Sequence, residues 1–123
     1  MIPLRVALGS LLLLSACGGG ADFHPSAPPP HTLTPKSPDA VEVIVGPAPD
    51  RPAVAIGTLE GTSSAHPPTG DGHEDVLAHL REAAGEQGCD AIVLSPIEQK
   101  LYATSNGTPL YRAHQNATCL VYR

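Results

Sequence analysis

The sequence predicts an α+β fold, in which a small, mostly antiparallel sheet of about four strands carries one helix on one face. Three observations support this prediction. Short runs of β-branched and apolar residues alternate with turn-forming residues over residues 39–123. One segment near residue 80 has apolar residues at helical spacing. Residues 18–38 contain little that a core could bury, so we expect a disordered, proline-rich tether before the domain.

The first sixteen residues have the three parts of a secretory signal. Arg5 supplies a positive charge, residues 6–14 are apolar, and Ser15 and Ala16 are the small residues that a cleavage site requires. The apolar run is about half of the ~20 residues that span a bilayer, so it predicts no permanent membrane helix. We therefore expect residues 1–16 to be a signal peptide.

Leu14-Ser15-Ala16-Cys17 resembles the lipobox of bacterial lipoproteins. This resemblance implies that the thiol of Cys17 receives a diacylglycerol, that the chain is cut before it, and that the new amino group is acylated. Each buried methylene contributes about 0.8 kcal/mol, so two or three acyl chains would hold a domain on a membrane. The alternative is an ordinary secretory signal with Cys17 as a bystander.

Gly18 bears on the destination of such a lipoprotein. It follows Cys17 directly, at the position where an aspartate would resemble an inner-membrane retention signal. Because this residue is Gly, we expect the protein to be in the outer membrane rather than the inner one. The domain would then face the periplasm or the cell surface. Residues 17–38 would form the lipidated cysteine and a tether, since six of residues 18–38 are Pro and three are Gly. The alternative for this segment is an extended ligand of a partner.

Residues 39–123 are expected to form one small α+β domain. The predicted strands are residues 41–45, 54–61, 91–97 and 118–122, and residues 101–103 and 110–112 flank an Asn106-Gly107 turn. That turn predicts either a hairpin or an irregular excursion. Residues 91–97 are the most apolar, so we expect this strand to be central.

One helix is expected over residues 74–87. Its apolar stripe consists of Val76, Leu77, Leu80, Ala83 and Ala84. Asp71 and Glu74 have the spacing of a capping box, and Gly88 suits a left-handed C-terminal cap. The stripe predicts that one face of the helix packs against the sheet.

Cys89 and Cys119 remain once Cys17 is assigned to lipid. Paired cysteines commonly join in an exported protein, which favours a disulfide, and two separate buried thiols are the alternative. No CxxC or Cys–His spacing indicates a metal or redox site.

Three stretches of the chain resemble a known family. VEVIV at residues 41–45, RPAVAIGTLEG at 51–61 and LREAAGEQGCDAIVL at 80–94 resemble the Rcs envelope-stress sensor lipoproteins (RcsF-like) and, more distantly, YbjQ-like domains. The resemblance implies their fold, and the Cys119-Leu120-Val121 run matches the C-terminal strand of the sensor. The sensor carries four domain cysteines and is basic, whereas this chain has two and is acidic, so the signalling role is not implied.

The charge balance and the low aromatic content argue against nucleic acid as a partner. Loss of Arg5 leaves six basic and twelve acidic residues, which moves the formal net charge from −5 to −6. No basic cluster is present, so nucleic acid is not expected as a partner. One Phe, three Tyr and no Trp offer few stacking surfaces for bases or sugars.

The leading hypothesis is a non-enzymatic envelope lipoprotein. Its domain would bind or sense another envelope component through edge strands and the 62–73 loop, with no cofactor, no metal and no catalytic residue. The alternative is a small metal-dependent or hydrolytic enzyme that uses the His/Asp-rich 66–75 loop, with His66, His73 and His114 as metal ligands. A third alternative is a structural spacer lipoprotein.

Overall fold

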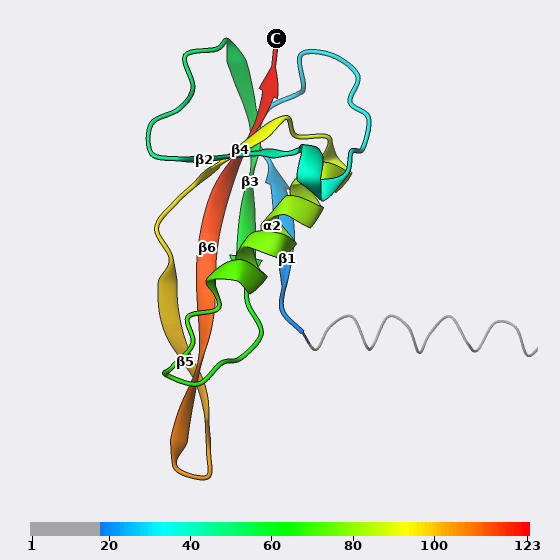
Figure 1. Ribbon diagram of the computed structural model, residues 1–123. Coiled ribbons are helices and arrows are strands. Elements are labelled where there is room, and N and C mark those ends of the chain that lie inside the picture. Colours follow the sequence, from blue (N-terminus) through cyan, green and yellow to red (C-terminus); the bar gives the residue numbers. More distant parts are fainter. Residues whose placement is uncertain (1–17) are drawn as a thin grey trace, which may run out of the picture.

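The computed structural model describes residues 18–123, so the predicted lipidation site at Cys17 lies outside the described residues. The fold has two layers, a six-stranded sheet and helix α2 (His73–Gln87) packed on one face (Figure 1). The strands are β1 (Gly20–Pro25), β2 (Glu42–Val45), β3 (Ala53–Thr62), β4 (Ala91–Leu94), β5 (Glu98–Ser105) and β6 (Thr108–Tyr122). Their order is β1-β3-β6-β4-β2, and β5 pairs with β6. The α+β class predicted from the sequence is therefore confirmed.

The predicted number of strands was wrong. The sheet has six strands rather than about four, because β1 and β5 add to the expected set. The sheet is mostly antiparallel, as predicted, but it includes one parallel pair that the sequence did not predict, between β2 and β4. A parallel pair needs a long crossover, and here the crossover contains both β3 and α2.

Strand β6 occupies the centre of the sheet, where we had expected residues 91–97. Its C-terminal half lies between β3 and β4, and its N-terminal half pairs with β5. The separate strands expected at 110–112 and 118–122 are therefore one strand of 15 residues. Small buried side chains alternate along it and let α2 lie close; they are Ala113, Ala117, Cys119 and Val121.

Helix α2 packs on the sheet through Val76, Leu80 and Ala84, which are fully buried at i, i+4 and i+8. The close approach depends on Gly61 of β3, because a Cβ there would lie 2.8–2.9 Å from Leu80 and Val76. Gly88 ends the helix in the left-handed conformation at φ 79°.

The predicted capping box does not form at the start of α2. The N-cap residue is Gly72, in the left-handed conformation at φ 68°, and it has no side chain to cap the helix. Instead, the N–H of His73 donates to Asp71 Oδ1 at 2.9 Å. A short polar side chain thus satisfies one of the free N–H groups of the first turn.

The prediction of a disordered tether over residues 18–38 was wrong for residues 20–25. They form edge strand β1, whose six residues pair antiparallel with β3 from Gly57 to Thr62. Backbone pairing does not depend on apolar side chains, so composition gave no sign of it. Phe23 also packs onto the core, in space left free because Gly57 has no Cβ.

The rest of the expected tether is also attached to the domain. Leu33 packs on the core, the N–H of Lys36 donates to the C=O of Gly85 at 2.9 Å, and Pro38–Ala40 form a short 3₁₀ helix. These contacts lay the segment across the C-terminal half of α2 (Figure 1). The folded unit therefore begins near Gly20 rather than near residue 39.

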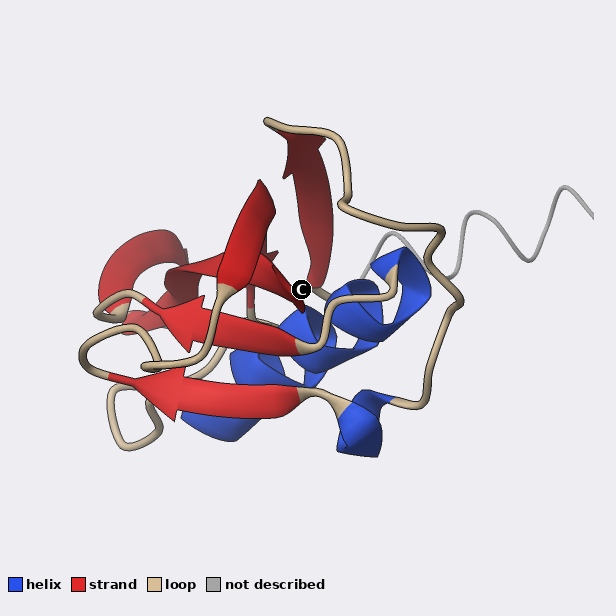
Figure 2. Cartoon of the chain, turned by 90° about the horizontal axis from the view of Figure 1, so that it is seen from above, coloured by secondary structure: helices blue, strands red, loops and turns tan. Residues whose placement is uncertain are grey.

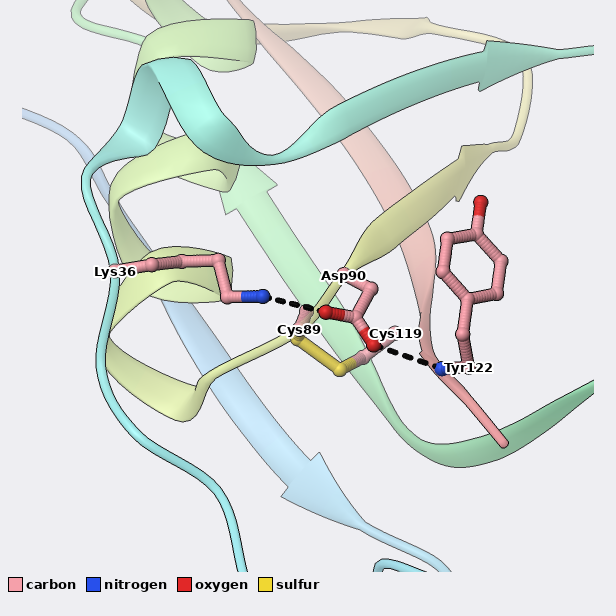
Figure 3. Close-up of a disulfide and its surroundings, with 5 residues drawn as sticks. All are labelled: Lys36, Cys89, Asp90, Cys119 and Tyr122. Atoms are coloured by element: carbon pink, nitrogen blue, oxygen red, sulfur yellow. Dashed lines mark hydrogen bonds and ion pairs between the residues drawn. A yellow bond between two sulfur atoms is a disulfide. The ribbon is translucent and has the colours of Figure 1, made fainter.

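A disulfide joins Cys89 to Cys119, with their Cα atoms 5.6 Å apart (Figure 3). It connects the end of α2 to the central strand β6, and both cysteines are fully buried. Of the two alternatives left by the sequence, the structure has the disulfide rather than two separate thiols.

Asp90 sits beside the disulfide and links the N-terminal segment to the last strand (Figure 3). Lys36 Nζ donates to Asp90 Oδ1 at 2.5 Å, and the N–H of Tyr122 donates to Oδ2 at 2.8 Å. Partial burial disfavours the ionised carboxyl, but these two hydrogen bonds and the Lys36 charge outweigh it, so the pKa of Asp90 is lowered.

Candidate functional site

The face of the sheet opposite α2 is the main candidate for a binding surface, and we call it the open face. Helix α2 contacts β1, β3, β4 and β6 on the other face. In the view from above, the long helix lies against the strands (Figure 2). Within residues 18–123 no second helix covers the open face. The strand registers place polar side chains there; they are Asp22, His24, Thr58, Glu60, Thr62, Glu98, Lys100, Arg112, His114, Asn116 and Thr118.

A polar hollow of about 530 Å³ lies on the open face. Asp22, Glu60 and Glu98 bring carboxylates to its wall, and Lys100 brings an ammonium group. Glu60 also lies near His24 of β1, with 3.4 Å between Oε2 and Nε2. The arrangement suits hydrogen-bonding and cationic groups of a ligand, since acceptors outnumber the positive charges at the wall.

His114 lies at the wall of this hollow, and its pKa is lowered. Burial of the imidazole, and then the positive charges of Lys100 and Arg112, lower the pKa of His114 below its usual range. Its Nδ1 lies 3.4 Å from Thr62 Oγ1. The neutral ring therefore prevails at pH 7 and, because Nδ1 contacts Thr62, it offers Nε2 to a ligand.

The three histidines of the alternative metal site are not brought together. His66 Nε2 lies 2.8 Å from Gln99 Oε1, and its backbone bridges to Tyr111. His73 starts α2, and His114 lies on the open face. Among residues 18–123, no group of three His, Cys, Asp or Glu side chains is placed to hold a metal ion.

The 62–73 loop is attached to the sheet more firmly than the sequence suggested. The amide of Gln99 donates to the C=O of Asp71 at 2.6 Å, and its Oε1 contacts His66. These contacts hold the loop against β5. Some hydrogen-bonding groups of the loop are therefore already paired within the domain.

The sequence did not predict the open face, although it offered His114 as a metal ligand in the enzyme alternative. Asp22, Glu60 and His114 are far apart in the chain and match no motif. A signal was nevertheless present in residues 57–62 and, apart from Gln115, in residues 113–119, where polar residues alternate with small or apolar ones. Such alternation indicates a strand with one solvated face.

A second feature is the β5–β6 hairpin, which extends beyond the body of the domain (Figure 1). All eight residues of β5 are exposed, including Leu101 at 63% and Tyr102 at 54%. Asn106 and Gly107 form its turn with φ of 52° and 79°, as an Asn-Gly hairpin turn requires. The hairpin alternative of the sequence prediction is therefore the one that the structure shows.

An apolar hollow of about 480 Å³ lies at the C-terminal ends of β2 and β4, beside the segment that connects β4 to β5. Val45, Leu94, Pro96 and Ile97 form its apolar wall, and Val45 is 80% exposed. Gln115 also lines it; its amide donates to the C=O of Ser95 at 2.8 Å, while its buried Oε1 has no partner among the described residues. The hollow thus presents exposed apolar surface.

Comparison with solved structures identifies one similar fold. The chain resembles the crystal structure of a Francisella virulence factor, FvfA, with a TM-score of 0.54 and 12% sequence identity. The match covers 80% of this chain and 96% of that one. At this identity the likeness shows the fold alone. No protein-family model matches the chain, and no curated protein matches it either.

The described residues offer no helical membrane span. Within residues 18–123, no helix is long and apolar enough to cross a bilayer.

Proposed function

We propose that this protein is a non-enzymatic bacterial envelope lipoprotein, anchored by acyl chains on Cys17, that binds or senses another envelope component through its open face. The anchor holds the domain at the outer membrane, with the domain facing the periplasm or the cell surface. The observation that carries the binding role is the open face itself, a sheet surface with a polar hollow and without a second covering layer in residues 18–123.

Two features support the envelope setting. The Leu14-Ser15-Ala16-Cys17 stretch has the residue types and position of a lipobox. The Cys89–Cys119 disulfide fits export, because disulfides persist in the periplasm and are rare in the reducing cytosol.

The hollow supports a binding role rather than a catalytic one. The Thr62 hydroxyl lies 3.4 Å from His114 Nδ1, but among residues 18–123 no carboxylate forms a hydrogen bond or ion pair with this ring, so the group that would orient a nucleophile–base pair is not in place. The separated histidines also leave the metal-dependent alternative without a ligand set among residues 18–123. The mixture of carboxylates and a lysine at the hollow suits recognition of a polar surface.

Site-specific photocrosslinking of the full chain in cells tests the binding role. A photoreactive residue replaces Thr58, which is exposed on the open face, and the matched control replaces Glu86, which is exposed on the outer side of α2. The proposal expects a defined crosslinked product from position 58 and none from position 86. Equal products at both positions, or none at position 58, would contradict it.

Palmitate labelling tests the anchor separately. Cys17→Ala should abolish labelling, and Cys89→Ala should retain it, because Cys89 is paired with Cys119. Labelling that survived Cys17→Ala would refute the anchor without bearing on the open face.

A further inference from the structure

The outer edge of β5 is an unpaired strand edge. Strand β2 covers the outer side of β4 as far as the Val45–Leu94 pair, and in the described part of the chain nothing pairs with β5 on that side. All of its side chains are exposed. A long, exposed edge that contains Leu101 and Tyr102 is a template for pairing with another strand.

The hydrogen bonds of β6 show which backbone groups of β5 face outward. Tyr111 exchanges both of its backbone bonds with His66 at 2.8 Å, on the side away from β5. Its cross-strand partner Leu101 is therefore in a non-hydrogen-bonded pair. The N–H and C=O of Leu101 consequently point to the free edge.

The same reasoning applies to Gln99. Its partner Ala113 accepts from the N–H of Ser63 and donates to Ser63 Oγ, both at 2.9 Å and both away from β5. Gln99 therefore also presents its N–H and C=O to the free edge. The edge thus offers donors and acceptors at two positions separated by one residue, as an antiparallel partner strand needs.

We propose that the occupant of this edge is β5 of a second copy of the chain, paired antiparallel about a two-fold axis at Gln99. Gln99 then faces Gln99 of the second copy as a hydrogen-bonded pair. Glu98 of each copy faces Lys100 of the other copy, which gives two such pairs. This inference stands on residues 94–113 and does not depend on the proposed lipid anchor.

Charge complementarity selects the second copy as the occupant. Glu98 and Lys100 project on the open face, since they pair with His114 and Arg112. In the Gln99-centred register they form two opposite-charge pairs at non-hydrogen-bonded positions, where cross-strand side chains approach most closely. Moving the axis by two residues, to Leu101, sets Lys100 against Tyr102 and removes both pairs.

On the other face of the same register, one apolar pair lies on each side of the central Gln99 pair. Leu101 of each copy faces Ile97 of the other copy, beside the hollow lined by Val45 and Leu94. The pairing thus covers Leu101, which is 63% exposed, with the apolar surface that the hollow leaves open. It also joins the two sheets so that both open faces lie on the same side.

A single cysteine on the two-fold axis tests this arrangement in the full chain. Cα atoms of a hydrogen-bonded antiparallel pair lie about 5.5 Å apart, which a disulfide can bridge. Gln99→Cys should therefore give a reducible dimer when isolated membranes are treated with a mild oxidant. The matched control is Thr104→Cys on the same exposed strand, because its two copies would lie about 34 Å apart in this register.

Charge reversal gives a second readout in which Gln99 is unchanged. Glu98→Lys or Lys100→Glu alone should weaken dimerisation roughly tenfold, measured by sedimentation of detergent-extracted protein, because both pairs become repulsive. The two reversals together should restore the dimer. A monomeric unmodified protein, equal crosslinking at positions 99 and 104, or failure of the double reversal to restore association would overturn the inference.

Discussion

Removal of the Cys89–Cys119 disulfide should destabilise the domain strongly. The bridge closes a loop with a sequence separation of 30 residues. In the chain-entropy relation, a loop of this length contributes about 3.6 kcal/mol at 25 °C by restricting the unfolded chain. A domain of this size has a total stability of roughly 5–15 kcal/mol, so this one bond is a large share.

The perturbation is Cys89→Ala combined with Cys119→Ala in residues 18–123, exported by a conventional signal. Both cysteines are fully buried and small, so alanine keeps the Cβ atoms in the core and adds no polar group. Urea unfolding followed by circular dichroism should show the midpoint falling by roughly 2 M. Reductant should shift the midpoint of the unmodified protein in the same direction and leave the variant unchanged.

Two results would refute this reasoning. One is a double variant whose free energy of unfolding lies within about 1 kcal/mol of the unmodified protein, since the entropy relation then fails here. The other is an unmodified protein that reductant leaves unchanged and whose thiols both react with an alkylating agent after unfolding.

Three further predictions concern packing and charge. Gly61→Ala should destabilise the domain by about 1–3 kcal/mol, because the new Cβ would lie 2.8 Å from Leu80; Gly20→Ala is the control, with no atom within 4 Å of its added Cβ, and equal losses in thermal unfolding would contradict this packing. Leu80→Ala should cost about 2–5 kcal/mol in urea unfolding, since it leaves a cavity under α2, and a loss below 1 kcal/mol would argue against its burial. Lys36→Met should destabilise the domain at pH 7 and less at low pH: the folded pKa of Asp90 is lowered, so its contribution is full above the unfolded pKa of about 4 and disappears as the pH falls through the folded value. A destabilisation that stayed constant from pH 7 to pH 2 would show that the Lys36–Asp90 pair is not its source.

The helix and the hairpin were accessible from local sequence signals. The helix depends on its own apolar stripe of Val76, Leu80 and Ala84 and on the left-handed Gly88 at its end. The Asn106-Gly107 turn likewise depends on the conformational preferences of these two residues. Such features are determined by neighbouring residues, which a sequence displays directly.

Strand β1 was not accessible in the same way. Its attachment to β3 rests on backbone hydrogen bonds and on the fit of Phe23 over Gly57, and both depend on residues more than thirty positions away. The free β5 edge is likewise a property of the sheet order rather than of its own residues. The high proline content of residues 18–38 correctly indicated that they contribute few buried side chains. It wrongly indicated that they are disordered.

The most direct test of the account is intact-mass analysis of the full chain extracted from membranes, with and without reductant and a thiol-alkylating agent. We expect a chain that begins at Cys17 and carries acyl groups there, and whose two other cysteines react with the alkylating agent only after reduction. A chain that keeps residues 1–16, or one cut at this point without fatty acid, would contradict the proposal that lipid holds this domain in the envelope.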